Sequence, residues 1–325
     1  ETGRSFTFTY FEFTTVLAAM IFARAGVDIV IWETGMGGRL DSTNVVRPIA
    51  SIITGIALDH QAYLGDTIEK IAAEKAGIVK PGVPVFTGVM PDEARRVIAE
   101  RARELECDCF PVSKEDFKPV TRRFDGTRTV QEFDYEGRRI TLPLIGEMQR
   151  RNFRLAALVL EKLSPRLGID LDRAFRALAT CRWPGRCQQV NERLIVDGGH
   201  NPDGIAALCA ALKETFPGEK FTVVFAGFRD KDIAGGLRLL AELAAKFIFV
   251  PLRESDRPSY SGEELIALAK QSGVKSQFAS APDAAAALKL AYEDAPRRVV
   301  AAGSLYLAGD VLSASVDPAA VLNLE

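Results

Sequence analysis

Two residues that suit a divalent cation follow two apolar stretches of the chain. Glu33 ends one run, DIVIWE, and His60 ends another, SIITGIALDH. Both runs are rich in β-branched residues and indicate strands, and ligands of parallel α/β sheets bind where strands end. Glu33 alone would suit an ordinary polar strand end, but a carboxylate and an imidazole together suit a metal ion. Glu33 and His60 are therefore candidate metal ligands.

The segment after Glu33 is rich in glycine. Gly35, Gly37 and Gly38 would let the backbone approach phosphate oxygens closely. Lys75 follows in the string IAAEKAGIVK, on an expected helix. From spacing alone, Lys75 could equally pair with Glu74 or Glu69 on a solvated helix face.

A third string, LIVDGGHNPDG, has the pattern of a strand, a turn and a helix start. It contains His200, one of only two histidines in the chain. An Asx cap explains Asn201, but it does not explain why Asp197 and His200 converge beside two glycines. This string indicates contact with a nucleotide or a substrate.

Composition limits the classes of partner. The chain has 325 residues, is 47% hydrophobic, and carries 41 basic and 43 acidic residues. This length and apolar content suit two globular domains, and the near balance of charge disfavours nucleic acid or an anionic membrane as a partner. Small-molecule partners are expected. No apolar run approaches the roughly 20 residues that span a bilayer, and no signal-peptide pattern is present, so a cytoplasmic location is expected.

Strands and helices are expected to alternate along most of the chain, which is typical of a parallel α/β sheet. The expected helices of the first part cover residues 11–25, 67–76, 91–105 and 152–163, and the expected strands cover 27–32 and 49–56. Residues 110–145 alternate polar and apolar and indicate a hairpin that turns at Glu136 and Gly137. The string CRWPGRCQ interrupts the helical pattern, so we expect domains at residues 1–183 and 184–325, the second one smaller and Rossmann-like.

Several strings together resemble the folylpolyglutamate synthase and dihydrofolate synthase family, within the Mur ligase superfamily. In chain order they are TYFEF, WETGMGGRLDSTN, ALDHQAYLG, EKAGIVK, WPGR, VDGGHNP, RDKDIAG and AAGSLYLAGDV. The resemblance implies a Mur-ligase-like α/β fold, with a mostly parallel ATPase domain followed by a Rossmann-like C-terminal domain.

The resemblance also implies a reaction. ATP would phosphorylate a carboxylate of a folate or of dihydropteroate, and the amine of L-glutamate would then attack the acyl phosphate. Glu33 and His60 would bind Mg²⁺, and Lys75 would be carbamylated, which places a negative charge beside the metal. The family also implies a monomer.

The remaining site residues come from the same resemblance. ATP would be bound by Asn152, Arg186 and Asp197. His200 would lie near the glutamate end of the reaction. The residues that would line the pterin or pteroate pocket are Thr9, Tyr10, Phe11, Glu12, Leu40, Asp41 and Ser42.

One family motif is not in this sequence. The family begins with a P-loop, and no GxxxxGK[ST] string occurs here, while the chain opens without an initiator Met. We therefore expect a fragment that hydrolyses ATP poorly on its own. Two alternatives stay open: another Mur-type amino-acid ligase acting on a cell-wall precursor, and a non-catalytic folate-binding module. The motifs also leave open whether the parent enzyme makes dihydrofolate as well as polyglutamates.

Overall fold

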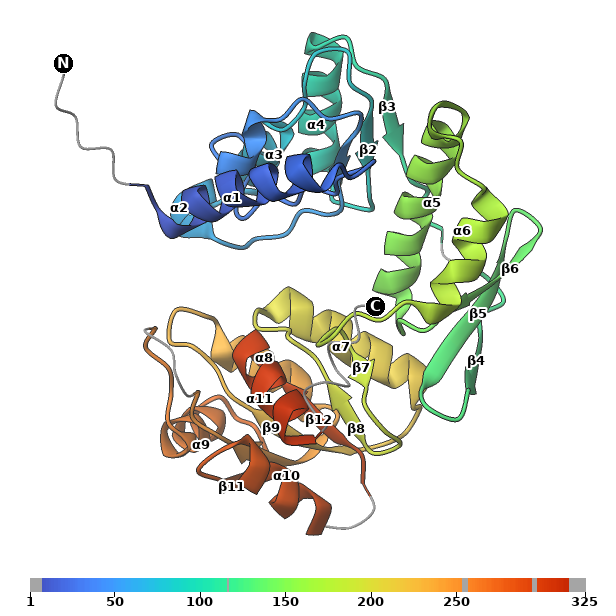
Figure 1. Cartoon of the computed structure of the whole chain (residues 1–325). Helices are drawn as coiled ribbons and strands as arrows, with labels where there is room; N and C mark the ends of the chain where they lie inside the picture. The colour runs from blue at the N-terminus through green and yellow to red at the C-terminus, as the bar shows by residue number, and fades with distance from the viewer. Residues whose placement is uncertain (1–7, 116, 253–256, 294–296, 316–325) are drawn as a thin grey trace, which may run out of the picture. The chain divides into compact units, whose positions relative to one another are not determined.

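The computed structural model describes residues 8–115, 117–252, 257–293 and 297–315, which divide into two compact units (Figure 1). Unit 1 comprises residues 1–114 and 154–163, and unit 2 comprises residues 115–153 and 164–325. These units are defined by internal packing. The domain boundary expected at residue 183 stays a prediction.

Unit 1 is built on a parallel sheet. Within the described residues the sheet has the order β1-β2-β3, with Ile52 opposite Phe86 and Phe86 opposite Phe110. Its elements are α1 (Tyr10–Ala25), η1 (Ser42–Val45), β1 (Ser51–Ile53), α2 (Gln61–Leu64), α3 (Ile68–Ala76), β2 (Val85–Thr87), α4 (Asp92–Glu104), β3 (Cys109–Pro111) and part of α5 (Glu147–Leu167).

The two faces of this sheet are covered by different helices. On one face, Ile53 and Val85 pack against buried residues of α3 and α4, such as Ile71 and Ile98. On the other face, Phe86 packs against Leu155 and other residues of α5. The alternation of Val85 and Phe86 between faces is the period of two expected for a strand. Thr67 caps α3, because its hydroxyl accepts a hydrogen bond from the Lys70 amide at 3.3 Å.

The strand expected at residues 27–32 is a wrong prediction. These residues have no regular secondary structure, and their aliphatic side chains are exposed, with Ile31 at 95%. A strand forms only when its backbone groups pair with a neighbour. Within the described residues β1 pairs with β2 alone, and residues 28–31 have no strand partner.

Unit 2 begins with an antiparallel sheet, β4-β5-β6, formed by β4 (Thr121–Phe124), β5 (Thr129–Tyr135) and β6 (Arg138–Leu142). The expected hairpin is confirmed, since β5 and β6 pair around Glu136 and Gly137. Both turn residues have positive φ, 48° and 75°, as a tight two-residue hairpin turn requires. The helical residues α6 (Leu171–Ala177) and η2 (Leu178–Thr180) follow the unit 2 part of α5.

The rest of unit 2 is a doubly wound sheet of order β11-β10-β9-β12-β8-β7 within the described residues. Every pairing is parallel except that of β7 with β8. Its elements are β7 (Gln188–Gln189), β8 (Leu194–Val196), α7 (Pro202–Thr215), β9 (Phe221–Phe225), α8 (Ile233–Ala241), β10 (Ala244–Phe249), α9 (Gly262–Gln271), β11 (Gln277–Ser280), α10 (Ala284–Glu293), β12 (Val299–Ala302) and α11 (Leu305–Ser315).

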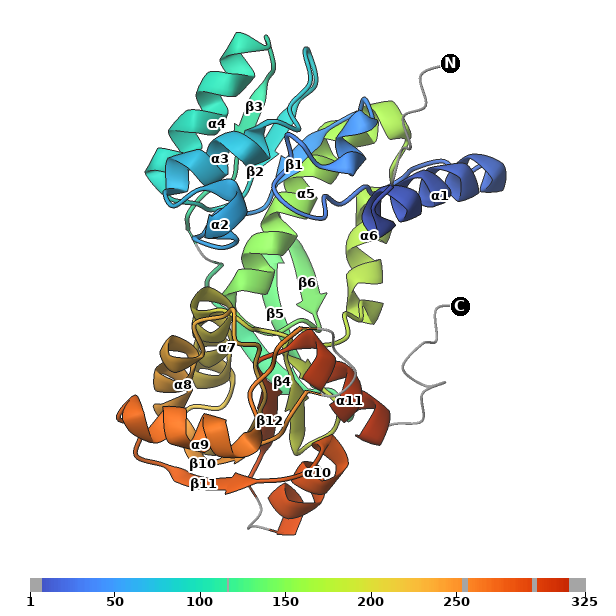
Figure 2. The ribbon, with the colours of Figure 1, turned by 90° about the vertical axis from the view of Figure 1, so that its left-hand side faces the viewer.

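Helices cover both faces of this sheet, as Figure 2 shows. Buried residues of α7, α8 and α9 pack on one face, against Ile195, Val223 and their neighbours. Buried residues of α10 and α11 pack on the other face, against Leu194 and Val224. The strands are therefore apolar on both sides, which explains their continuous hydrophobic runs. The Rossmann-like expectation for this part of the chain is confirmed.

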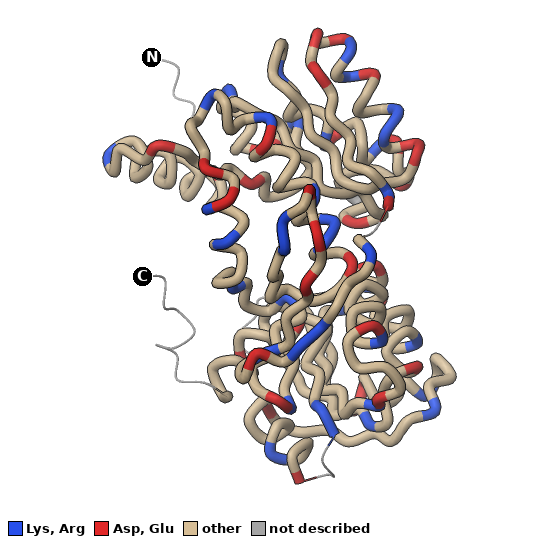
Figure 3. The backbone as a smooth tube through the Cα atoms, turned by 90° about the vertical axis from the view of Figure 1, so that its right-hand side faces the viewer, with Lys and Arg blue, Asp and Glu red and all other residues tan. Residues whose placement is uncertain are grey.

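Charge is mixed along the chain. Figure 3 shows basic and acidic residues interspersed along the backbone of both units, in keeping with the near balance of 41 basic and 43 acidic residues. Binding of an anion therefore depends on local groups and not on a general field. Of the helices in the described part of the chain, none combines the length and the apolar character needed to cross a bilayer.

Candidate functional site

The glycine-rich loop of unit 1 folds against the C-terminal end of α3. The Arg39 amide donates to the Glu74 carbonyl at 2.8 Å, and the Arg39 guanidinium forms an ion pair with the Glu74 carboxylate at 2.9 Å. The Asn44 side-chain amide donates to the Gly77 carbonyl at 3.1 Å. The backbone carbonyl of Asn44 accepts a hydrogen bond from Lys80 Nζ at 2.9 Å. The strings GMGGRLDSTN and EKAGIVK, which lie more than 20 residues apart, are thus one structural unit.

Two glycines of this loop are required by close contacts. A Cβ on Gly38 would lie 2.9 Å from the Glu74 carbonyl oxygen and 3.1 Å from that of Lys75. A Cβ on Gly35 would collide with the ring of Phe11. These glycines therefore let the loop lie directly on α3 and let Phe11 lie over the loop, which places a predicted pterin-binding residue beside the predicted phosphate-binding backbone.

Asp41 organises the loop from within. Its carboxylate accepts hydrogen bonds from the Met36 amide at 2.8 Å, the Thr43 amide at 3.0 Å and the Thr43 hydroxyl at 2.5 Å. Burial alone would raise the pKa of Asp41, but the bonds from Thr43 and Met36 outweigh it and lower this pKa below its ordinary value. Asp41 also caps η1, where Ser42 meets the Thr15 hydroxyl at 2.9 Å.

The candidate metal ligands are both exposed. Glu33 lies in the irregular segment before the loop, and His60 precedes α2 with a left-handed backbone, φ 51°. Within the described residues neither side chain makes a hydrogen bond or an ion pair, so both donor groups are available. No group of three or more His, Cys, Asp and Glu side chains in the described chain could hold a metal. Mg²⁺ usually keeps several waters and phosphate oxygens beside one or two protein ligands, and the assignment of Glu33 and His60 to this ion stays a prediction.

Lys75 is half-buried in the last turn of α3. Its neighbour Glu74 pairs with Arg39, so the pairing of Lys75 with Glu74 that spacing allowed is not formed. Lys75 itself forms no ion pair in the part of the chain that the structure describes. Its amine is therefore available for modification.

The segment TYFE forms the start of α1. Thr9 and Glu12 make a capping box, with the Thr9 amide donating to the Glu12 carboxylate at 2.8 Å and the Glu12 amide donating to the Thr9 hydroxyl at 3.2 Å. Hydrogen bonds from Thr9 lower the pKa of Glu12. Tyr10 and Leu40 are highly exposed, at 84% and 79%, while Phe11 is held over Gly35.

In unit 2 the structure brings Arg186, Asp197 and His200 together. Asp197 follows β8, and its carboxylate accepts the Gly199 amide at 2.6 Å and the Cys187 amide at 2.8 Å. Burial raises the pKa of Asp197 although both hydrogen bonds act to lower it. The His200 ring lies 3.1 Å from the Gly198 carbonyl, and Asn201 caps α7 by accepting the Gly204 amide at 2.8 Å.

Asn152 is placed apart from these loops in the sequence, on α5. It is exposed and donates to the Gln149 side chain at 3.2 Å. Its segment belongs to unit 2, like Arg186 and Asp197.

One polar network was missed from the sequence. Arg150 is 1% exposed and donates to the Gln131 side chain at 2.7 Å and to the Glu214 carboxylate at 3.0 Å. Arg122 also pairs with Glu214. This network joins α5, α7 and the antiparallel sheet within unit 2. An arginine in an amphipathic helix gives no signal that it is buried, so the sequence could not reveal it.

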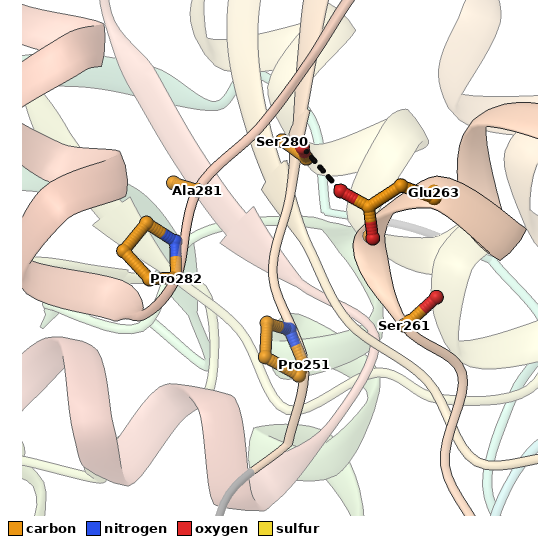
Figure 4. Close-up of a pocket in the computed structure, with 7 residues that line it drawn as sticks. Pro251, Ser261, Glu263, Ser280, Ala281 and Pro282 are labelled. Carbon is orange, nitrogen blue, oxygen red and sulfur yellow. Dashed lines mark hydrogen bonds between the residues drawn. The ribbon is translucent and has the colours of Figure 1, made fainter.

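A cavity of about 330 Å³ lies elsewhere in unit 2, at the carboxyl ends of β10 and β11 (Figure 4). Its lining residues are Pro251, Ser261, Gly262, Glu263, Ser280, Ala281 and Pro282. The Ser280 hydroxyl donates to the Glu263 carboxylate at 2.9 Å. None of the residues predicted from the sequence lines this cavity, so we assign it no role in the predicted chemistry.

Known proteins resemble the chain along most of its length. Residues 5–160 match the Mur ligase middle domain, and residues 185–305 match the Mur ligase, glutamate ligase domain. The dihydrofolate synthase/folylpolyglutamate synthase of Bacillus subtilis (strain 168) is 38% identical over 247 residues, which cover 73% of this chain and 56% of that protein. The folylpolyglutamate synthase of Lacticaseibacillus casei is 32% identical over 315 residues, which cover 94% of this chain and 71% of that protein.

The fold agrees with this relationship. The structure of Mycobacterium tuberculosis folylpolyglutamate synthase, complexed with ADP and AMPPCP, matches with a TM-score of 0.81 and 27% identity. The match covers 96% of this chain and 74% of that one. The Mur-ligase-like α/β fold expected from the sequence is confirmed. With both Mur ligase domains matched and most of a folylpolyglutamate synthase covered, the chain belongs to the folylpolyglutamate synthase and dihydrofolate synthase family of the Mur ligases.

Proposed function

We propose that the chain is the greater part of an ATP-dependent ligase that joins L-glutamate to a folate. Dihydropteroate is the second candidate acceptor. The names of its relatives support the folate substrate, and the bound nucleotides of the Mycobacterium tuberculosis enzyme support ATP. The observation that carries the proposal is the packing of the loop GMGGRLDSTN on the string EKAG, since Gly38 lies against the carbonyls of Glu74 and Lys75.

The proposed reaction has two steps. A carboxylate oxygen of the acceptor attacks the γ-phosphorus of ATP, which gives an acyl phosphate and ADP. The amine of glutamate then attacks the acyl carbon, loses a proton and expels phosphate, leaving an amide. Water must be excluded from the acyl phosphate, and negative charge on the transferred group must be neutralised by nearby donors and cations.

In this proposal Glu33 and His60 hold Mg²⁺, which would neutralise charge on the phosphates when bound. Lys75 is carbamylated, by addition of its amine to CO₂ with loss of a proton. The availability of all three side chains within the described residues supports these roles. The amides of the loop that includes Gly35 and Gly38 would donate to phosphate oxygens.

For the substrates, we assign Asn152, Arg186 and Asp197 to ATP and His200 to the glutamate end of the reaction. Phe11 would stack on the flat pterin ring, since it already lies over Gly35. The other residues of the acceptor pocket would be Thr9, Tyr10, Glu12, Leu40, Asp41 and Ser42. We also propose a monomeric enzyme, as the family resemblance implies, with the cytoplasmic location expected from the sequence.

The test measures incorporation of labelled glutamate into tetrahydrofolate and, separately, into dihydropteroate. The 325-residue chain and the complete product of its gene are both assayed with ATP, Mg²⁺ and bicarbonate. Incorporation that requires ATP and one of these acceptors supports the proposal, and the preferred acceptor defines the activity. If neither protein adds glutamate to either acceptor, the folate assignment is wrong. Amino-acid addition to a cell-wall nucleotide precursor would then point to a different Mur-type ligase.

A further inference from the structure

Two side chains that the proposed reaction does not use lie between the glycine-rich loop of unit 1 and the turn after α3. Asn44 ends the loop string GMGGRLDSTN, and Lys80 ends the string EKAGIVK. Both residues are half-buried. Within the described residues the Lys80 ammonium has no carboxylate partner, and it donates to the Asn44 backbone carbonyl at 2.9 Å. We call this pair the Asn44–Lys80 clamp.

The side chain of Asn44 ties the loop to the end of α3. Its amide nitrogen donates to the Arg39 carbonyl at 3.1 Å and to the Gly77 carbonyl at 3.1 Å. The first bond closes the loop on itself, and the second reaches the residue that follows α3, where carbonyls lack helical partners. A side-chain amide has two hydrogens, so these two bonds use the full donor capacity of Asn44.

Lys80 holds the same loop from the opposite direction. Its ammonium bonds a carbonyl of η1, and lysine side chains bind favourably to carbonyls at the end of a helical turn. The backbone of Lys80 is itself fixed, because its carbonyl accepts the Val83 amide at 3.1 Å and the Cys107 thiol at 3.2 Å. The ammonium therefore extends from an ordered turn to the end of the loop.

The clamp encloses the predicted acceptor-binding residues of the loop. Residues 40–42 lie between Arg39 and Asn44, the two ends of the hydrogen bond that closes the loop. Ser42 also meets the Thr15 hydroxyl of α1 at 2.9 Å. The first turn of α1 contains the other predicted acceptor residues, so the position of the loop influences both parts of the acceptor pocket.

The other side of the clamp is close in the chain to Lys75. Gly77, whose carbonyl accepts the Asn44 amide, lies two residues after Lys75. Gly38 of the loop packs on the Lys75 carbonyl itself, where a Cβ would lie 3.1 Å away. A loop held in this way keeps its acceptor residues in one place relative to Lys75, and catalysis is sensitive to displacements of about 1 Å.

We propose that Asn44 and Lys80 are positioning residues, which hold the acceptor-binding residues of the loop in place relative to Lys75 and do not contact the substrates themselves. The identity of the acceptor residues and the role of Lys75 rest on the proposed function. The clamp rests on hydrogen bonds within unit 1 alone. Two measurements separate these parts.

The first measurement is hydrogen exchange of the backbone amides in the 325-residue chain. In Asn44→Ala, the Arg39 amide, which donates to the Glu74 carbonyl, is expected to exchange about tenfold faster because the loop leaves α3 more often. Ser51→Ala is the matched control, since the Ser51 hydroxyl donates to the Ile78 carbonyl in the same turn at 3.2 Å but belongs to β1. The control should leave exchange at Arg39 unchanged. Unchanged exchange at Arg39 in Asn44→Ala would overturn the clamp.

The second measurement is glutamate ligation by the complete gene product, with tetrahydrofolate and dihydropteroate as acceptors. Asn44→Ala and Lys80→Met are each expected to raise the KM for the acceptor about tenfold, while the KM for ATP stays within about twofold of wild type. Lys80→Arg should recover the acceptor KM to within about threefold of wild type, because a guanidinium can donate to the same carbonyl. Ser51→Ala should behave like wild type.

The results that contradict the positioning role are specific. An unchanged acceptor KM in Asn44→Ala and Lys80→Met, or an equal rise in the KM for ATP, would overturn it. If the complete gene product adds glutamate to neither acceptor, the proposed function fails and the positioning role fails with it. Hydrogen exchange at Arg39 still decides whether the clamp exists.

Discussion

Asp41 shows how one side chain sets the shape of a binding loop. The sequence placed it among candidate acceptor-binding residues, and the structure shows it satisfying the Met36 amide and both donors of Thr43. An aspartate beside a glycine-rich loop is an obvious candidate for chemistry, but its hydrogen bonds depend on how the loop closes. Spacing in the sequence does not reveal that closure.

Substitution of Asp41 by Asn is expected to destabilise unit 1 by about 1–2 kcal/mol at pH 7, because an amide nitrogen replaces one acceptor oxygen. The folded pKa of Asp41 lies below its ordinary value of 3.8, so the stabilisation is present above that value and is lost as the pH falls through the lower folded pKa. Urea unfolding at pH 7, 5 and 3.5 tests this. The difference between wild type and variant should shrink only at the lowest pH, and Asp28→Asn, at an exposed site, should show little difference throughout.

The metal assignment can be tested with Mn²⁺ in place of Mg²⁺, and His200, the other histidine of this chain, provides the control. If His60 binds the metal, pulsed electron paramagnetic resonance of the complete gene product with Mn²⁺ and ATP will detect coupling to an imidazole nitrogen. His60→Gln is expected to abolish this coupling, and His200→Gln is expected to retain it. The reverse pattern would transfer the metal site to His200.

At the scale of elements, close contacts explain the glycine pattern of the loop. The sequence predicted backbone approach to phosphate from Gly35, Gly37 and Gly38. The structure adds a second reason, which is that Gly38 packs on the C-terminal carbonyls of α3. This contact joins residues far apart in the sequence. A glycine suits both phosphate binding and packing on α3, so the sequence alone could not reveal the packing.

Gly38→Ala is expected to destabilise the chain by about 1–3 kcal/mol, because its methyl would lie 2.9 Å from a backbone oxygen that cannot move freely. Thermal or urea unfolding measures the change. Gly309→Ala in α11 is the control, since nothing lies within 4 Å of a Cβ there and alanine favours the helix. Equal stability of the Gly38 variant and the wild type would contradict the packing described here.

The buried network of Arg150 makes a prediction for helix packing. Glu214→Gln would remove the carboxylate that pairs with Arg150 and Arg122, and the loss of this partly exposed charge is expected to cost about 1–3 kcal/mol. The double variant Arg150→Met/Glu214→Leu should lose less free energy of unfolding than the sum of the losses in Arg150→Met and in Glu214→Leu. A double-mutant cycle by urea unfolding measures this difference. Additive losses would mean that the pair makes no coupled contribution.

At the scale of the whole molecule, the sequence predicted the alternation of strands and helices and the hairpin at Glu136 correctly. These features depend on local periodicity and turn chemistry, which one sequence contains. The strand expected at residues 27–32 failed because apolar β-branched residues do not form a strand without a paired neighbour, and none is present in the described chain. For the site, positions after apolar runs in the sequence identified candidate residues. The hydrogen bonds made by Asp41, Asp197 and Arg150 could be seen only in the folded structure.

The central claim is that the acceptor carboxylate is activated as an acyl phosphate before glutamate attacks. The most direct test uses tetrahydrofolate, and in parallel dihydropteroate, labelled with ¹⁸O in the carboxylate that is extended. With the complete gene product, ATP and glutamate, each amide formed should deliver one ¹⁸O atom to inorganic phosphate, and the nucleotide product should be ADP. Appearance of ¹⁸O in AMP, or amide formation without transfer of ¹⁸O to phosphate, would contradict the proposed chemistry.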